Sequence, residues 1–167
     1  PRYDYQQTGL APLEVVLTFD DEMSALTVRK IFIFEAGSHT ITVLHEATNT
    51  SSNRIQITPF AQIKRDTSPA PASNDSGMGM QPFLGAALTQ PDQRFAKFDF
   101  DDMADEHFNA DIKGGWVAML QHYFVTAWVP DDTATYRYST RQTRAGFNIV
   151  GYTGPALRIA PAETARV

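Results

Sequence analysis

Hydrophobic and polar residues alternate along the first third of the chain in short runs rich in Val, Ile, Thr and Phe. Such runs are typical of half-buried β-strands, because successive strand side chains point to opposite faces. In one run, Ile41 and Val43 fall on the face opposite to Thr40 and Thr42. The pattern predicts four strands here: Glu14–Phe19, Leu26–Phe34, His39–Glu46 and Arg54–Arg65.

Short polar or glycine-containing segments separate these predicted strands, at Asp20–Glu22, Glu35–Ser38 and Asn49–Asn53. Connections of this length suit antiparallel neighbours, because parallel strands need crossovers of about a dozen residues or more. We therefore expect an antiparallel meander and an all-β fold with little helix.

The stretch Trp116–Val129 is the most ambiguous part of the second half, because its large side chains also fall at helical spacing. A helix here would have no polar face. The glycines before it, Pro130 behind it and its aromatic and β-branched residues favour two buried strands, with a kink near Gln121–His122. Three more strands are predicted after it: Thr135–Arg141, Gly146–Tyr152 and Ala156–Ile159.

The stretch Thr67–Met80 is rich in Pro, Ser, Gly and Ala and contains almost nothing to bury. It predicts an exposed loop over residues 67–80 rather than a linker between domains. We therefore interpret residues 1–167 as a single β-rich domain. The sequence begins and ends without an evident boundary signal, so we expect a piece of a longer protein.

The composition narrows the class of protein. The hydrophobic fraction of 43% and the charged fraction of 20% are typical of a globular domain. The net charge of −5 opposes a general nucleic-acid-binding or anionic-membrane surface. The absence of cysteine excludes thiolate metal sites and disulfides. No apolar run approaches the roughly 20 residues of a membrane-spanning helix, so we expect a soluble piece.

The acidic stretch Asp99–His107 suggests calcium, because hard cations take several carboxylate oxygens. The spacing does not fit a calcium loop. Met103 stands where a ligand is needed, Ala104 replaces the glycine of the turn, and Ala110 replaces the closing glutamate. We predict a solvated acidic turn or a short helix here, and no metal site.

The four histidines, His39, His45, His107 and His122, show no zinc spacing. Two of them, His45 and His122, suit structural hydrogen bonds. A sugar-processing site would instead require one of these two to face an acid such as Glu46 or Asp111. There is no G-x-S-x-G motif, and Gly77-Met78-Gly79 is not continued as a dinucleotide loop. The sequence therefore predicts no catalytic residue and no cofactor.

One cluster combines basic and aromatic residues: Arg137, Arg141 and Arg144 are interleaved with Tyr136 and Tyr138. Such a cluster is able to grip an anionic partner. On a strand, however, Arg137 and Tyr138 point to opposite faces, so the cluster is not one surface. We expect a solvated strand face, and the residues that bind a partner remain unknown.

The segment Lys113–Pro130 (KGGWVAMLQHYFVTAWVP) resembles the GGWVAMLQ-YF-TAWIP segment of the YidC-type membrane protein insertases of Gram-negative bacteria, with both tryptophans in register. Phe83–Ala87 followed by Pro91-Asp92 is similar to the FRGAA…PD segment of that family. Upstream, Leu26–Phe34, followed by Gly37 and the strand Thr40–Val43, is similar to the T-K-T-F…G-Y-V-V segment of that family. The resemblance extends over residues 26–167 and is strongest in the middle.

The resemblance implies a β-supersandwich fold, similar to galactose mutarotase, in the large periplasmic loop of an inner-membrane protein. It further implies a non-catalytic domain that aids the insertion and folding of integral inner-membrane proteins, alone or with the Sec translocon. The implied partners are the accessory proteins SecD/SecF and nascent membrane proteins. The membrane spans that perform insertion are outside this sequence, so no residue here is assigned that chemistry.

Two other hypotheses remain open. One is a carbohydrate-binding or epimerase-like domain, which the supersandwich shape suggests, although a shared fold does not transfer activity. The other is a periplasmic chaperone that binds peptides at an exposed strand edge or in an apolar cleft. Titration with sugars, with the fluorescence of Trp116 and Trp128 as the readout, separates the first of these hypotheses from a docking domain.

Overall fold

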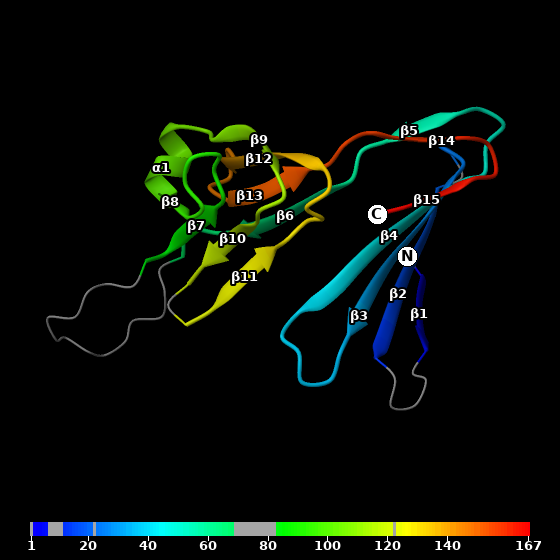
Figure 1. Cartoon of the computed structure of the whole chain (residues 1–167), viewed down its shortest axis with the longest axis horizontal. Helices are drawn as coiled ribbons and strands as arrows, with labels where there is room; N and C mark the ends of the chain where they lie inside the picture. The colour runs from blue at the N-terminus through cyan, green and yellow to red at the C-terminus, as the bar shows by residue number, and fades with distance from the viewer. Residues whose placement is uncertain (1, 7–11, 22, 69–82, 122) are drawn as a thin grey trace, which may run out of the picture. The chain divides into compact units, whose positions relative to one another are not determined.

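A computed structural model describes residues 2–6, 12–21, 23–68, 83–121 and 123–167 (Figure 1). Strands dominate it, every strand pair among these residues is antiparallel, and one short helix accompanies them. The prediction of an all-β, antiparallel fold with little helix is confirmed. The similarity to galactose mutarotase stays a prediction.

The chain divides into two compact units, and each is described by itself. Unit 1 comprises Pro1–Ile57 and Ala156–Val167, and unit 2 comprises Thr58–Pro155. The interpretation of residues 1–167 as a single domain stays a prediction. Most of the loop predicted over residues 67–80 lies outside the described residues.

Unit 1 contains a five-stranded sheet in the order β1-β2-β3-β4-β15 and a two-stranded sheet of β5 and β14. The strands are Arg2–Gln6 (β1), Leu13–Asp21 (β2), Leu26–Phe34 (β3), Ile41–Asn49 (β4), Ile55–Ile57 (β5), Leu157–Ile159 (β14) and Thr164–Arg166 (β15). Strands β2, β3 and β4 form the meander that the alternation predicted. The bounds predicted for β3 are those observed.

The strand predicted over Arg54–Arg65 is wrong in one respect, because it is two strands. It is interrupted at Thr58-Pro59, between β5 in unit 1 and Phe60–Arg65 (β6) in unit 2. Proline lacks the N–H that a ladder needs, so the strand cannot continue through Pro59. The Pro59 carbonyl instead accepts a hydrogen bond of 2.8 Å from the backbone N–H of Gly154.

Unit 2 contains two four-stranded sheets, in the orders β11-β10-β7-β8 and β6-β13-β12-β9. Their remaining elements are Gly85–Leu88 (β7), Ala96–Asp99 (β8), Phe100–Asp105 (α1), Asn109–Lys113 (β9), Val117–Leu120 (β10), Val125–Trp128 (β11), Thr135–Gln142 (β12) and Asn148–Thr153 (β13). Alternate residues of both sheets meet in one apolar cluster. Its buried members are Ala86, Leu88, Met103, Ile112, Val117, Met119, Tyr138 and Val150.

The stretch Trp116–Val129 forms two strands, β10 and β11, as predicted, but two details are wrong. Only β10 is buried, whereas Val125, Thr126 and Ala127 of β11 are exposed. The predicted kink is a hairpin turn, after which β11 pairs with β10. Strand β10 lies between β7 and β11 and is covered by the core, while β11 is the edge of its sheet.

The acidic stretch begins with a short helix, in agreement with one of the two predictions for it. Asp99 is the N-cap of α1, its side chain accepts from the backbone N–H of Asp102, and the Asp102 side chain accepts from the Asp99 N–H. This reciprocal capping box satisfies two N–H groups that the helix itself leaves unpaired. Met103 turns into the core and fixes the helix against it. Among the described residues, no helix has the length and hydropathy needed to cross a bilayer.

Candidate functional site

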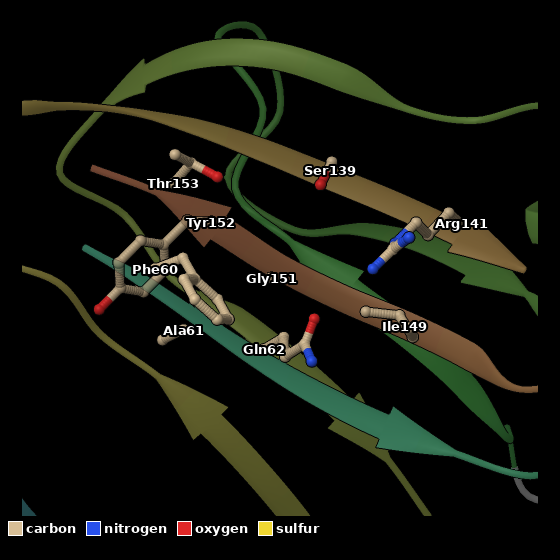
Figure 2. A pocket seen from close by; sticks show the side chains of 9 residues that line it. All are labelled: Phe60, Ala61, Gln62, Ser139, Arg141, Ile149, Gly151, Tyr152 and Thr153. Atoms are coloured by element: carbon tan, nitrogen blue, oxygen red, sulfur yellow. The ribbon is translucent and has the colours of Figure 1, made fainter. Parts of the chain in front are cut away.

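The outer face of the β6-β13-β12-β9 sheet carries a shallow depression, shown in Figure 2. Strand alternation produces this face. Because Tyr138 and Val150 point into the core, their neighbours on β12 and β13 point away from it. The residues that line the depression are Phe60, Ala61, Gln62, Ser139, Arg141, Ile149, Gly151, Tyr152 and Thr153.

Antiparallel register arranges the outer side chains in three rows across strands β12, β13 and β6. The first row is Arg137–Thr153–Phe60, the middle row is Ser139–Gly151–Gln62, and the third row is Arg141–Ile149–Lys64. Directly opposed residues on a sheet face lie within side-chain contact of one another. The middle row has a serine and a glycine at Ser139 and Gly151, whereas each outer row has an arginine and a further large side chain, so the surface is hollow around Gly151.

Gly151 lies at the centre of the depression. A Cβ atom at this position would lie 2.3 Å from the carbonyl oxygen of Ala61 and 2.9 Å from Cα of Gln62. Strand β6 therefore approaches β13 too closely at this point for any other residue. Glycine inside a strand often marks such a close backbone approach. Gly151 both permits the approach and leaves the floor of the depression without a side chain.

The lining is polar at its centre and carries one cation. Gln62 and Ser139 offer amide and hydroxyl groups, and Arg141 is exposed at one side. On the opposite side, the Phe60 ring is 64% exposed. Hydrogen-bond donors next to an exposed ring suit a polar chain segment with an apolar side chain. No Asp, Glu or His is among the described residues that line the depression.

Three charged residues that flank the depression on this face, Arg137, Asp111 and Lys64, have partners of their own. The Arg137 guanidinium donates to the two carboxylate oxygens of Asp111 at 3.0 and 3.3 Å. This hydrogen bond holds the pKa of Asp111 below its usual value and raises the pKa of Arg137. The ammonium of Lys64 lies 3.8 Å from the centre of the Phe147 ring, a cation–π contact. Arg141 is thus the cation that a ligand in the depression would meet.

The basic and aromatic cluster divides between the two faces of the sheet, as predicted. Arg137 and Arg141 belong to the outer face, and the rings of Tyr136, Tyr138 and Tyr152 pack together inside. The Tyr138 hydroxyl is buried and donates to the Gly114 carbonyl at 2.5 Å. Burial raises the pKa of Tyr138 and, with the Tyr136 charge, that of Tyr152. Both phenols are therefore neutral at physiological pH.

The sequence named histidine and acid pairs that a sugar-processing site would need, and the described residues do not bring them together. Glu46 lies beside His45 in β4 and therefore points to the opposite face. Its carboxylate pairs with Arg29 at 2.6 Å and with Arg166 at 3.7 Å. His45 lies opposite Lys30, and its burial, followed by the Lys30 charge, lowers its pKa. His122 lies outside the described residues.

His39 and His107 are exposed, and neither belongs to the depression. Arg144 lies in the turn between β12 and β13. Among the described residues, no group of three or more His, Asp or Glu side chains is placed to hold a metal ion. In the acidic stretch, the carboxylates of Asp99 and Asp102 accept the backbone hydrogen bonds that cap α1.

Trp116 and Trp128, the residues proposed as reporters of sugar binding, have structural contacts. The Trp116 ring lies 5.6 Å from that of Phe95, and the Trp128 indole N–H donates to the Gln62 carbonyl at 3.4 Å. The second contact joins β11 to β6, at the edge of the depression. The sequence left the binding residues unknown, and the glycine inside the predicted strand Gly146–Tyr152 is the signal that could have led to this surface.

The fold and this surface define an all-β domain with a recessed sheet face, whose described lining carries hydrogen-bonding groups and the Arg141 cation. Comparison with known proteins is more specific. Residues 2–167 match the family described as YidC periplasmic domain. The chain belongs to this family, and it therefore lies on the periplasmic side of the bacterial inner membrane.

Relatives agree with the family. A "Membrane protein insertase YidC" of a Marinomonas species is 40% identical over 155 residues, which cover 93% of this chain and 28% of that protein. The protein of the same name from Shewanella piezotolerans is 37% identical, with 95% of this chain and 28% of the relative covered. That of Pseudoalteromonas atlantica is 36% identical, with 98% and 30% covered. The chain thus spans less than a third of these relatives, and the resemblance stated from its tryptophan segment is confirmed.

Proposed function

We propose that this chain is a non-catalytic docking domain of a membrane protein insertase, which aids the insertion and folding of integral inner-membrane proteins. The proposal is supported by the name that the relatives share and by their greater length, which leaves room for an inserting part outside this chain. The chain itself would act as one domain that recruits partners, with or without the Sec translocon.

The depression around Gly151 is the observation that carries the docking role. Its lining provides an exposed ring, a cation and uncharged polar groups, but no acid and base pair within the described residues. This combination binds a chain segment and does not activate a bond, since acid–base chemistry needs a group that exchanges protons near neutral pH. The partners that the role implies are SecD/SecF and nascent membrane proteins.

Site-specific cross-linking tests the proposal in a chimera, in which this chain replaces the matching segment of the Marinomonas relative. A photoreactive residue at Gln62 lies in the middle row of the depression. A second at Asp101, exposed on α1, is the matched control. We expect Gln62, but not Asp101, to cross-link to SecD/SecF or to a nascent inner-membrane protein in cells.

The charge of the depression provides the second arm. Arg141→Glu reverses the cation of the lining, and we expect it to reduce the Gln62 cross-links several-fold. Arg144→Glu changes the same charge in the neighbouring turn, and we expect it to leave them unchanged. Equal cross-linking from Gln62 and Asp101, or equal effects of the two arginine variants, would contradict docking at this surface.

A further inference from the structure

The hairpin of β10 and β11 ends in consecutive exposed hydrophobic side chains. Tyr123, Phe124 and Val125 are 82%, 74% and 64% exposed. Two backbone hydrogen bonds close the turn, from Gln121 N–H to the Phe124 carbonyl at 2.8 Å and from Phe124 N–H to the Gln121 carbonyl at 3.2 Å. We call Gln121 with Tyr123–Val125 the hairpin tip. Figure 1 shows this hairpin in yellow-green and yellow.

The hairpin tip is attached to a firmly packed base. Val117 and Met119 of β10 are buried in the core, and β10 pairs on both sides, with β7 and with β11. Exposed apolar residues usually occur singly on a protein surface, and a contiguous group of them indicates an interaction site. A group at the end of a two-stranded hairpin forms a protrusion, which suits penetration into a partner more than the reception of one.

Charge identifies the partner. The chain has 33 charged side chains in 167 residues, yet the segment from Gly114 to Pro130 contains no Asp, Glu, Lys or Arg. Without a basic group, and in a chain of net charge −5, attraction to anionic headgroups cannot hold the tip. Tyrosine, in contrast, is favoured at the boundary between lipid and water, since it joins an apolar ring to a polar hydroxyl, and a neighbouring phenylalanine adds apolar area to bury there.

We propose that the hairpin tip inserts Tyr123 and Phe124 into the interfacial region of the periplasmic leaflet of the inner membrane. The family to which the chain belongs places it on this side of the membrane. Two aromatic side chains bind a free bilayer weakly. Attachment to a membrane-bound protein raises the effective concentration of lipid, so a weak contact becomes populated. The contact would anchor unit 2 to the membrane through the edge of the sheet that ends in β11. This proposal does not depend on the docking role.

The absence of cysteine from the sequence makes single-site labelling direct. Gln121→Cys carries an environment-sensitive fluorophore at the tip, and Asp132→Cys carries it in the exposed segment after β11. Each labelled chain is tethered by a histidine tag, at one terminus or the other, to phosphatidylcholine vesicles that contain a nickel-chelating lipid. A second set of vesicles contains brominated phosphatidylcholine, which quenches fluorophores at the interface.

We expect a blue shift and at least twofold quenching for the label at Gln121 in one or both tethered forms, and neither for the label at Asp132. Both signals should persist at high salt, because no charge is involved. The double variant Tyr123→Ser with Phe124→Ser should reduce the Gln121 signal to the level at Asp132. Circular dichroism and tryptophan emission, unchanged in solution, establish that this variant is folded.

Three results would overturn the proposal. The first is no quenching at Gln121 from either tether, and the second is quenching that survives the double serine variant. The third is a blue shift that appears without vesicles as protein concentration rises, which would assign the tip to a second copy of the chain. Failure of the cross-linking at Gln62 would leave this result unaffected, so the two proposals fail separately.

Discussion

The interiors of the two units of this chain differ in what stabilises them. Unit 2 has a two-sheet core of apolar side chains, with Leu88 and Met103 fully buried. In unit 1, the buried hydrophobic residues among those described are Ile31, Ala47 and Ile159. Its long strands are mostly half-buried on both faces. The free energy gained from apolar burial is roughly proportional to the buried apolar area. Unit 2 is therefore stabilised more by burial per residue than unit 1.

Both units also bury polar side chains: among the described residues these are Asn49 in unit 1, and Thr140 and Asn148 in unit 2. The amide nitrogen of Asn49 donates to the carbonyls of Asn53 and Ile159, at 2.7 and 3.0 Å. Its amide oxygen accepts from the backbone N–H and the hydroxyl of Ser51, at 2.9 and 2.7 Å. Asn49 thus saturates its side chain while it joins β4 to a segment more than a hundred residues later in the chain.

The comparison teaches how each unit specifies its structure. An apolar core is non-directional and tolerates substitutions that conserve volume. A saturated buried amide is directional, because each of its atoms must be a donor or an acceptor as its neighbours require. Unit 2 should therefore respond to lost volume, and unit 1 to a changed hydrogen-bonding atom of the same volume.

The largest effect is expected from lost volume in unit 2. Leu88→Ala removes a fully buried side chain and should lower the free energy of unfolding by about 2–5 kcal/mol. Leu44→Ala, the same change at a half-buried position of β4, should cost about half as much or less. Urea denaturation measures both. Equal losses would remove the distinction between the two units.

Asn49→Asp tests the polar join of unit 1 with almost no change of volume. The new oxygen cannot donate, so the carbonyls of Asn53 and Ile159 lose the Asn49 donor and face a carboxylate. We expect a loss of about 2–3 kcal/mol, since each unsatisfied buried group costs about 1–3 kcal/mol. Asn53→Asp introduces the same charge at an exposed position and should leave the free energy of unfolding almost unchanged.

Hydrogen exchange locates the effect of this substitution. Both tryptophans lie in unit 2, so their fluorescence does not report on unit 1 directly. In Asn49→Asp we expect faster exchange in Leu157–Ile159 and Thr164–Arg166, the two strands that follow unit 2. Unchanged exchange there would mean that Asn49 does not hold the end of the chain.

The long strands that were predicted correctly are rich in residues with high β-propensity. Leu26–Phe34 is nine residues long and rich in β-branched and aromatic side chains, and its bounds were predicted correctly. Gly85–Leu88 and Asn109–Lys113 were missed, because they are short and have little β-propensity of their own. Their pairing with longer strands supplies what their sequence lacks. The exposure of Val125–Ala127 was missed for a related reason, since burial at a sheet edge depends on topology.

The depression could not be predicted from the sequence, because it depends on the pairing register of the strands. Arg141, Ile149 and Lys64 form one row only after three strands have paired, and the pairing depends on turns elsewhere. What the sequence did provide is alternation, which correctly separated Arg137 from Tyr138. It also provided the family, through a segment whose packing could not be read without the neighbouring strands.

A smaller effect tests whether unit 2 has a polar join of its own. Tyr138→Phe removes the buried hydroxyl that donates to the Gly114 carbonyl. We expect a loss of about 1 kcal/mol in urea denaturation, the net value of a typical hydrogen bond. Tyr136→Phe, whose ring packs on Tyr152, should cost less. A loss as large as that of Asn49→Asp would show that the two units depend on buried polar groups equally.

The smallest effect concerns the pH dependence of unit 1. The pKa of His45 is lowered by burial and then by the Lys30 charge, so the folded state prefers the neutral imidazole. The unfolded chain binds the proton at its ordinary pKa of about 6.5. The stabilisation is therefore complete above that pH and is lost as the pH falls from it through the lowered pKa.

Unfolding free energies measured between pH 5 and pH 7.5 test this dependence, a range well above the one in which Asp21, Asp111 and Asp131 titrate. We expect the wild-type stability to decline on the acidic side of this range and His45→Gln to flatten the decline. His39→Gln, at an exposed position, should leave it in place. Lys30→Gln should reduce the decline only in part, because burial is the larger cause of the lowered pKa and unit 1 retains that burial.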